Sequence, residues 1–77
     1  MKHKNKLKLR EALLNTEKPI EIKRLIASLE WSRHTPKSAI NMMSRVLTGK
    51  NDASHNLVYL FSKHCNVTLD FLYSNYK

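Results

Sequence analysis

The chain has 77 residues, a formal net charge of +8 at neutral pH and a sequence pI near 9.9. With 42% apolar residues, one glycine and two prolines, its composition excludes a disordered or low-complexity chain, and its length allows only one small core. It has neither the apolar run of ~18 to 20 residues that a membrane span needs nor the apolar segment of a signal peptide, and its single cysteine excludes an intramolecular disulfide. We therefore expect one cytoplasmic domain, whose positive charge suits DNA, RNA, an anionic membrane surface or an acidic partner.

The first ten residues, MKHKNKLKLR, carry a cation at every second position. The cations that we assign to a basic arm are Lys2, Lys4, Lys6, Lys8 and Arg10. We predict a flexible basic arm over residues 1–6, followed by a single domain over residues 7–77. The arm either lies on phosphates or in a minor groove, or is a solvated tail, and the sequence leaves both open.

Two short helices are predicted next. The first begins at Leu7 or Lys8 and buries Leu9, Ala12 and Leu13, with Leu14 beside them. The second lies in TEKPIEIKRLIASLEW, with Thr16 or Glu17 as its cap and Pro19 in its first turn. Its apolar stripe is predicted from Ile22, Leu25, Ile26 and Leu29. The only tryptophan, Trp31, closes this helix or starts the turn after it, and its large apolar area predicts a place in the core.

A third helix is predicted from the segment TPKSAINMMSRVLTGK, residues 35–50. Thr35 can cap its start, Pro36 suits the first helical position, and Gly49 can close its end in the left-handed conformation. Its apolar side comprises Ala39, Ile40, Met43, Val46 and Leu47. Its other side comprises Lys37, Ser38, Asn41, Ser44, Arg45 and Thr48. That second side is either an ordinary solvated face or a surface that binds the phosphates and base edges of a DNA major groove.

The last third of the chain predicts two more helices. Asp52 or Ser54 caps HNLVYLFSKHC, residues 55–65, and Asn66 ends it in the left-handed conformation. Val67 is predicted to be a buried plug. Thr68 then caps LDFLYSNY, in which Leu69, Leu72 and Tyr76 are expected to pack inward. The pattern gives five short helices without a strand, so we predict an all-α fold.

Catalytic and metal-binding constellations are missing from the sequence. The four histidines are scattered, the cysteine lacks a partner at metal-ligand spacing, and no carboxylate pair accompanies a nucleophile. We therefore expect no enzyme, no metal site and no cofactor.

The second half of the chain, MSRVLTGKNDASHNLVYLFSKHCNVTLDFLYSN, resembles the Cro and phage-repressor (XRE-type) helix-turn-helix family. The matching residues are Gly49, Leu57, Leu60, Phe61, Asn66, Val67, Thr68, Leu69, Asp70, Phe71 and Leu72. Upstream, LIASLEW resembles the first helix and turn of the motif, with Leu25, Leu29 and Trp31 at the family's apolar positions. This chain has Ile26 where the family has a small residue and Glu30 where it has a glycine. The span from Trp31 to Gly49 is also several residues longer than the family spacing, so the turn or the recognition helix is extended.

The resemblance implies a compact five-helix, lambda-repressor-like DNA-binding domain that inserts the helix from Thr35 to Thr48 into the major groove. The residues implied for reading bases are Lys37, Ser38, Asn41 and Arg45, and those for phosphate contact are Arg33, His34, Thr35, Ser44 and Lys50. Arg33 and His34 could equally be solvated charges of the loop. It also implies a homodimer, for which we predict Phe71, Tyr73 and Tyr76 as the interface. These aromatic residues could instead cover the domain's own end.

The resulting expectation is a sequence-specific regulator of transcription that binds double-stranded DNA, with a repressor of a phage or other mobile element implied by the resemblance. Two alternatives stay open. One is a protein-binding adaptor or inhibitor with the same fold, and the other is a non-specific nucleic-acid binder that acts through its basic arm.

Overall fold

The computed structural model describes residues 7–76, although not the side chain of Tyr76, and within this range every regular element is a helix. The elements are α1 (Leu9–Leu14), α2 (Pro19–Glu30), α3 (Pro36–Leu47), α4 (His55–Cys65), α5 (Leu69–Leu72) and a 3-10 helix η1 (Ser74–Tyr76). The predicted all-α, five-helix class is confirmed. The predicted arm over residues 1–6, with Lys2, Lys4 and Lys6, lies outside the described residues. None of the helices between residues 7 and 76 reaches the length and apolarity of a membrane-crossing helix.

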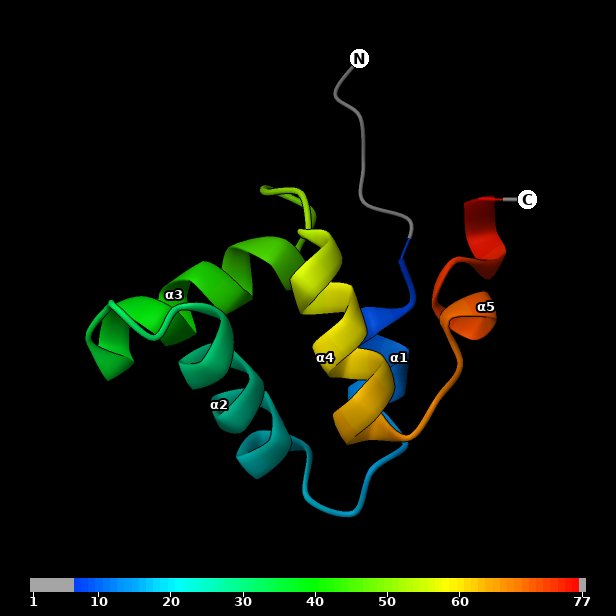
Figure 1. The fold of residues 1–77 in the computed structure, drawn as a ribbon, viewed down its shortest axis with the longest axis horizontal. Coiled ribbons are helices and arrows are strands. Elements are labelled where there is room, and N and C mark those ends of the chain that lie inside the picture. Colours follow the sequence, from blue (N-terminus) through cyan, green and yellow to red (C-terminus); the bar gives the residue numbers. More distant parts are fainter. Residues whose placement is uncertain (1–6, 77) are drawn as a thin grey trace.

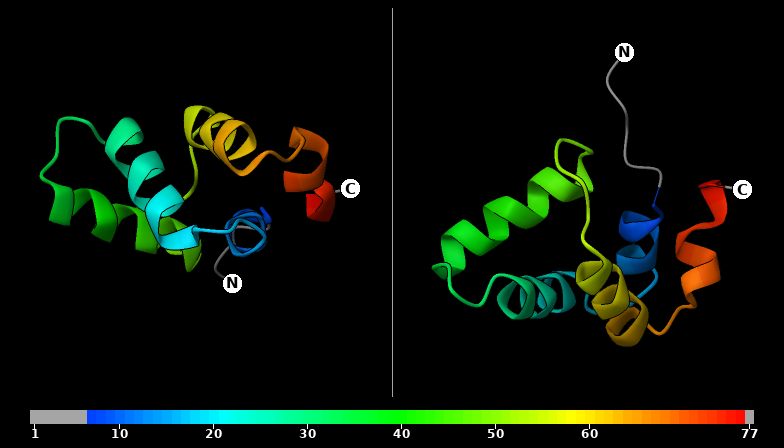
Figure 2. Two further views of the ribbon diagram at one scale, coloured as in Figure 1. Left: turned by 90° about the horizontal axis from the view of Figure 1, so that it is seen from below. Right: turned by 45° about the horizontal axis from the view of Figure 1, so that its top comes forward.

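The molecule is flat, measuring 35 × 32 × 18 Å, and α4 runs through its middle (Figure 1). Helix α2 packs against both α3 and α4, while α1 and α5 pack against α4 from the side away from α3 (Figures 1 and 2). A backbone hydrogen bond of 3.1 Å from the Lys8 N–H to the Leu72 carbonyl joins the start of α1 to α5. Helix α3 therefore lies at one edge of the fold, held chiefly by α2.

One core joins the helices. Its buried side chains are Leu9, Ala12, Leu13, Ile26, Ala27, Ala39, Met43, Val46, Leu57, Val58, Phe61, Cys65 and Leu72. Phe61 of α4 is the largest fully buried side chain. Since α4 supplies four of these residues and α5 only one, the core is centred on α4.

The ends of α3 and α4 follow the predicted signals. The Thr35 and Ser54 hydroxyl oxygens accept hydrogen bonds from the backbone N–H three residues on, at 3.2 and 3.1 Å. Asn66, directly after α4, and Gly49, two residues after α3, take the left-handed conformation with φ of 58° and 84°. The Thr68 hydroxyl caps α5 in the same way, at 3.1 Å. The predicted caps and stops of these helices are confirmed.

The predicted buried stripe of α2 is partly wrong. Leu25 and Leu29 are 41% and 47% exposed, whereas Ile26 and Ala27 are buried. Because α2 is covered by α3 on one side and α4 on another, its buried face is centred between Ile26 and Ala27 rather than on the leucine side.

The start of α2 also differs from its prediction. Lys18 occupies the cap position without a side-chain hydrogen bond, and Pro19 begins the helix as expected. The Thr16 hydroxyl is used elsewhere, because it donates to the Leu13 carbonyl at 2.7 Å at the end of α1.

Several apolar side chains are more exposed than predicted. Leu14 is 67% and Leu69 47% exposed, and Trp31 and Val67 are half-buried at the margin of the core. The predicted last helix is interrupted at Tyr73, where α5 ends and η1 begins one residue later. Four-residue α5 is too short to bury more than one of its faces, and only Leu72 is fully enclosed.

Candidate nucleic-acid interface

The outer side of α3 is a continuous polar and cationic surface, which we call the α3 face. Its residues are Lys37, Asn41, Ser44, Arg45 and Thr48, and all of them are exposed. At about 100° per residue they fall within an arc of about 100° on the helix, and Lys37 and Arg45 are about 12 Å apart along its axis. The α3 face is therefore narrow and about three turns long.

The opposite side of α3 is anchored in the core. Ala39, Met43 and Val46 are at most 3% exposed, and Ile40 and Leu47 are half-buried beside them. Both ends of α3 are fixed by hydrogen bonds. Besides the Thr35 cap, the Lys50 N–H donates to the Arg45 carbonyl at 2.8 Å and the Gly49 N–H to the Val46 carbonyl at 3.1 Å, which completes a Schellman motif. The α3 face is thus presented by a rigid helix.

The electrostatics of this region are one-sided. Between Trp31 and Asn51 the sequence has four lysine or arginine residues and no aspartate or glutamate. The first turn of α3 carries Lys37 and no acidic residue, although the helix dipole favours an anion there. A lysine in place of an acidic residue in the first turn does not stabilise the helix. It leaves the N-terminus of α3 able to attract an external anion such as a phosphate.

The predicted base-reading residues do not all share this exposure. Lys37, Asn41 and Arg45 lie on the α3 face, free of the core. Ser38 is half-buried at its margin, and its hydroxyl lies 3.5 Å from Nδ1 of His34. Ser38 is consequently the least accessible of the four to an incoming base edge.

The predicted phosphate-contacting residues are all exposed, and all but Ser44 lie beyond the two ends of the α3 face. Arg33, His34 and Thr35 belong to the turn before α3, and Lys50 follows its last turn. Ser44 lies on the α3 face itself, where its carbonyl accepts a hydrogen bond of 2.9 Å from the Thr48 hydroxyl. Between Trp31 and Gly49 the chain thus forms a turn over residues 31–35 and the 12-residue α3.

Two cations assigned to the basic arm belong instead to the folded domain. Lys8 precedes α1, and its Nζ lies 5.2 Å from the centre of the Phe71 ring, in cation–π geometry. Arg10 is exposed on α1, which packs against α2 and α4. Neither residue is part of the α3 face.

The residues predicted to form a dimer interface were expected to be exposed, but those that the structure describes are partly covered by the domain itself. Phe71 and Tyr73 are half-buried and pack against the domain's own core, while the side chain of Tyr76 lies outside the described part of the structure. The aromatic surface of α5 and η1 therefore covers the domain's own end to a large extent. The apolar side chain that α5 exposes is Leu69.

Glu30, at the end of α2, has a role that sequence reasoning missed. Its two carboxylate oxygens accept hydrogen bonds of 2.6 Å from the Ser54 hydroxyl and from Nδ2 of Asn56, at the start of α4. The partners are 24 and 26 residues away, so no local pattern could have revealed them. This clamp fixes the α2 end from which the turn to α3 departs.

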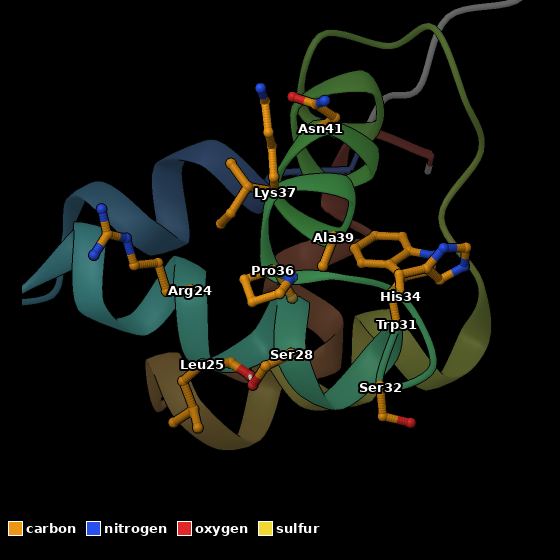
Figure 3. A pocket seen from close by; sticks show the side chains of 12 residues that line it. Arg24, Leu25, Ser28, Trp31, Ser32, His34, Pro36, Lys37, Ala39 and Asn41 are labelled. Atoms are coloured by element: carbon orange, nitrogen blue, oxygen red, sulfur yellow. Dashed lines mark hydrogen bonds between the residues drawn. The ribbon is translucent and has the colours of Figure 1, made fainter.

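A groove between α2 and α3 is the second missed feature (Figure 3). It has a volume of about 800 Å³ and is lined by residues from the second half of α2, the turn and the first half of α3. Trp31 contributes to its wall. Because the sequence predicts Trp31 to lie in the core, no sequence pattern indicated this site.

Metal-ligating residues do not gather anywhere between residues 7 and 76, where no group of three or more histidine, cysteine, aspartate or glutamate side chains could hold an ion. Cys65 is buried in α4, and burial raises the pKa of its thiol to about 11. The thiolate, which is the reactive form of cysteine, is therefore disfavoured near neutral pH.

Comparison of the chain with known protein families, with curated proteins and with solved structures found no match.

Proposed function

We propose that the protein is a sequence-specific regulator of transcription that binds double-stranded DNA through α3. The observation that carries the proposal is the α3 face: five exposed polar or cationic residues on a rigid helix at the edge of the fold, in a stretch without a carboxylate. Helix α2, the turn over residues 31–35 and α3 together have the form of a helix-turn-helix. The net charge of +8 supports a polyanionic partner.

The proposed contacts follow from the chemistry of the exposed side chains. The Asn41 amide can make a paired hydrogen bond with adenine, and Lys37 and Arg45 can donate to guanine or to phosphate. Arg33 and His34 approach the backbone from the turn. With side chains an α-helix is about 10 to 12 Å wide, which matches the B-DNA major groove of about 12 Å.

The finer parts of the proposal rest on the resemblance to the XRE-type family. They are a homodimer that reads two half-sites one helical turn apart, and repression in a phage or other mobile element. The proposed cytoplasmic location rests instead on the single cysteine, which suits a reducing compartment. The exposed side of α5 around Leu69 is the surface on which we would look first for the dimer contact.

Selection of bound duplexes from a random pool tests the proposal directly. We expect one short, palindromic site to emerge, bound at least ~10³-fold more tightly than random duplex at the same salt concentration. Equal affinity for all duplexes would show a non-specific nucleic-acid binder. Absence of binding even at low salt would leave the protein-binding adaptor as the better account.

A further inference from the structure

The groove between α2 and α3 has a floor that DNA binding does not require. Phosphates and base edges are polar, whereas this floor is apolar. The apolar lining comprises Leu25, Ala27, Trp31, Pro36, Ala39 and Ile40, and its deepest residues are the two buried alanines. Ala27 and Ala39 are 1% and 2% exposed, so the small side chains let the groove reach down to the packed surface of the two helices. DNA binding therefore does not account for an apolar groove at this place.

The rim of the groove is cationic. Arg24 extends from α2 and Lys37 from α3, and His34 lies at the turn (Figure 3). The remaining polar lining consists of two serines and Asn41, and no carboxylate lines the groove. The combination of apolar floor and cationic rim is complementary to a molecule with an apolar body and an anionic head.

The shape of the groove favours a small molecule over a protein segment. Its lining comes entirely from the continuous stretch 24–41, and the turn over residues 31–35 lines one end. A helix or strand from a partner would need a trough that is open at both ends. The volume of about 800 Å³ is in the usual range for sites of small organic ligands.

We propose that this groove binds a small amphipathic anion, with the apolar body over Trp31 and Ala39 and the head group between Arg24 and Lys37. Lys37 and Asn41 also belong to the α3 face, so an occupied groove competes with DNA for these two side chains. The competition with DNA rests on the proposed function, whereas the binding of the anion does not.

Octanoate is a suitable probe, with octan-1-ol as its uncharged counterpart and acetate as the anion without an apolar body. Because Trp31 is the only tryptophan of the chain, its fluorescence reports occupancy of the groove directly. We expect saturable binding of octanoate, confirmed by calorimetry, and at least about tenfold weaker binding of octan-1-ol and acetate. No saturable binding of octanoate in the millimolar range, or equal affinity for octan-1-ol, would overturn the proposal.

Two variants locate the site. Arg24→Gln removes a rim charge and should weaken octanoate binding by about threefold. Ser28→Phe places a ring over the groove from an exposed position of α2 and should abolish it. Lys63→Gln removes an exposed charge on α4, outside the groove, and is the matched control. If helical circular dichroism is unchanged and all three variants bind octanoate like the parent, the site lies elsewhere and the proposal fails. A response of Trp31 to polyglutamate but not to octanoate would identify an acidic protein partner instead.

Competition is measured with a duplex obtained from the selection. Octanoate should weaken DNA binding in proportion to its concentration, while acetate at the same ionic strength should not. By linkage, saturating DNA must weaken octanoate binding by the same factor. Equal affinity of octanoate for the free and the DNA-bound protein would refute the competition. A protein that binds octanoate but no DNA would retain the groove site and lose the proposed function.

Discussion

Helices α3 and α4 have 12 and 11 residues, and each starts after a hydroxyl cap and stops at a left-handed residue. Their surroundings differ. Helix α4 is enclosed by α1, α2 and α5 and buries four side chains. Helix α3 packs chiefly on α2 and buries three, those of Ala39, Met43 and Val46. The comparison teaches that the ends of a helix are specified locally, while the role of its faces is decided by what packs around it. Substitutions in α4 should accordingly change stability, and those on the α3 face should change binding.

The largest effect is expected at the centre of α4. Phe61→Ala removes the largest fully buried side chain and should lower the free energy of unfolding by about 3 to 5 kcal/mol, measured by urea denaturation. Tyr59→Ala is the matched control, because Tyr59 is an aromatic residue of the same helix that is 55% exposed. Equal losses in the two variants would contradict the central position of α4.

The next effect concerns the α3 face. Asn41→Ala and Arg45→Ala should each weaken binding to the selected duplex by about 1 to 3 kcal/mol, because each removes donors aimed at base edges or phosphate. Their free energies of unfolding should change by no more than about 0.5 kcal/mol, since both residues are exposed. Lys63→Ala, on α4, is the control for loss of charge alone. Normal binding by both α3 variants would show that α3 is not the recognition helix.

Helices α3 and α4 both end at a residue in the left-handed conformation, and the contribution of these two residues to stability can be tested in parallel. Gly49→Ala and Asn66→Ala should each cost about 1 kcal/mol of stability, because alanine is disfavoured at positive φ. Asn66→Gly should retain stability and serves as the control. A loss at only one of the two positions would mean that the helix ends are not equivalent.

The smallest effect is a pH dependence of the free energy of unfolding, caused by Cys65 in α4. Burial raises the pKa of the Cys65 thiol from 9.0 to about 11, so the unfolded chain loses this proton at a lower pH than the folded one. The contribution of Cys65 is constant below about pH 9, and the free energy of unfolding falls as pH rises from there toward 11, by about 1 kcal/mol or less near pH 9.5. Cys65→Ala shares all other titrating groups, so its stability should decline less steeply over this range. Identical pH profiles would show that Cys65 is accessible to water.

The features that could be predicted from the sequence are those that depend on a few neighbouring residues. The hydroxyl caps of Thr35, Ser54 and Thr68 and the stops at Gly49 and Asn66 each satisfy backbone groups within the same turn. The polar side of α3 could also be predicted, because its polar residues recur at helical spacing over the whole helix.

What could not be predicted depends on distant parts of the chain. A leucine has the same hydropathy whether or not a neighbouring helix covers it, so Leu25 and Leu29 could not be distinguished from Ile26. The groove arises from the angle between α2 and α3, and the Glu30 clamp joins helices that are far apart in sequence. Both features follow from the packing around α2.

The flat shape of the domain has a consequence for binding to neighbouring half-sites. Half-sites one helical turn apart are centred about 34 Å apart. Two copies whose 35 or 32 Å dimension runs along the duplex would come within contact distance of each other, whereas two copies that present their 18 Å dimension would be separated by a gap. If α3 binds in the DNA major groove, the direction of α3 within the flat domain determines how the domain lies along the duplex. That direction therefore decides whether two bound copies cooperate by direct contact or occupy their half-sites independently.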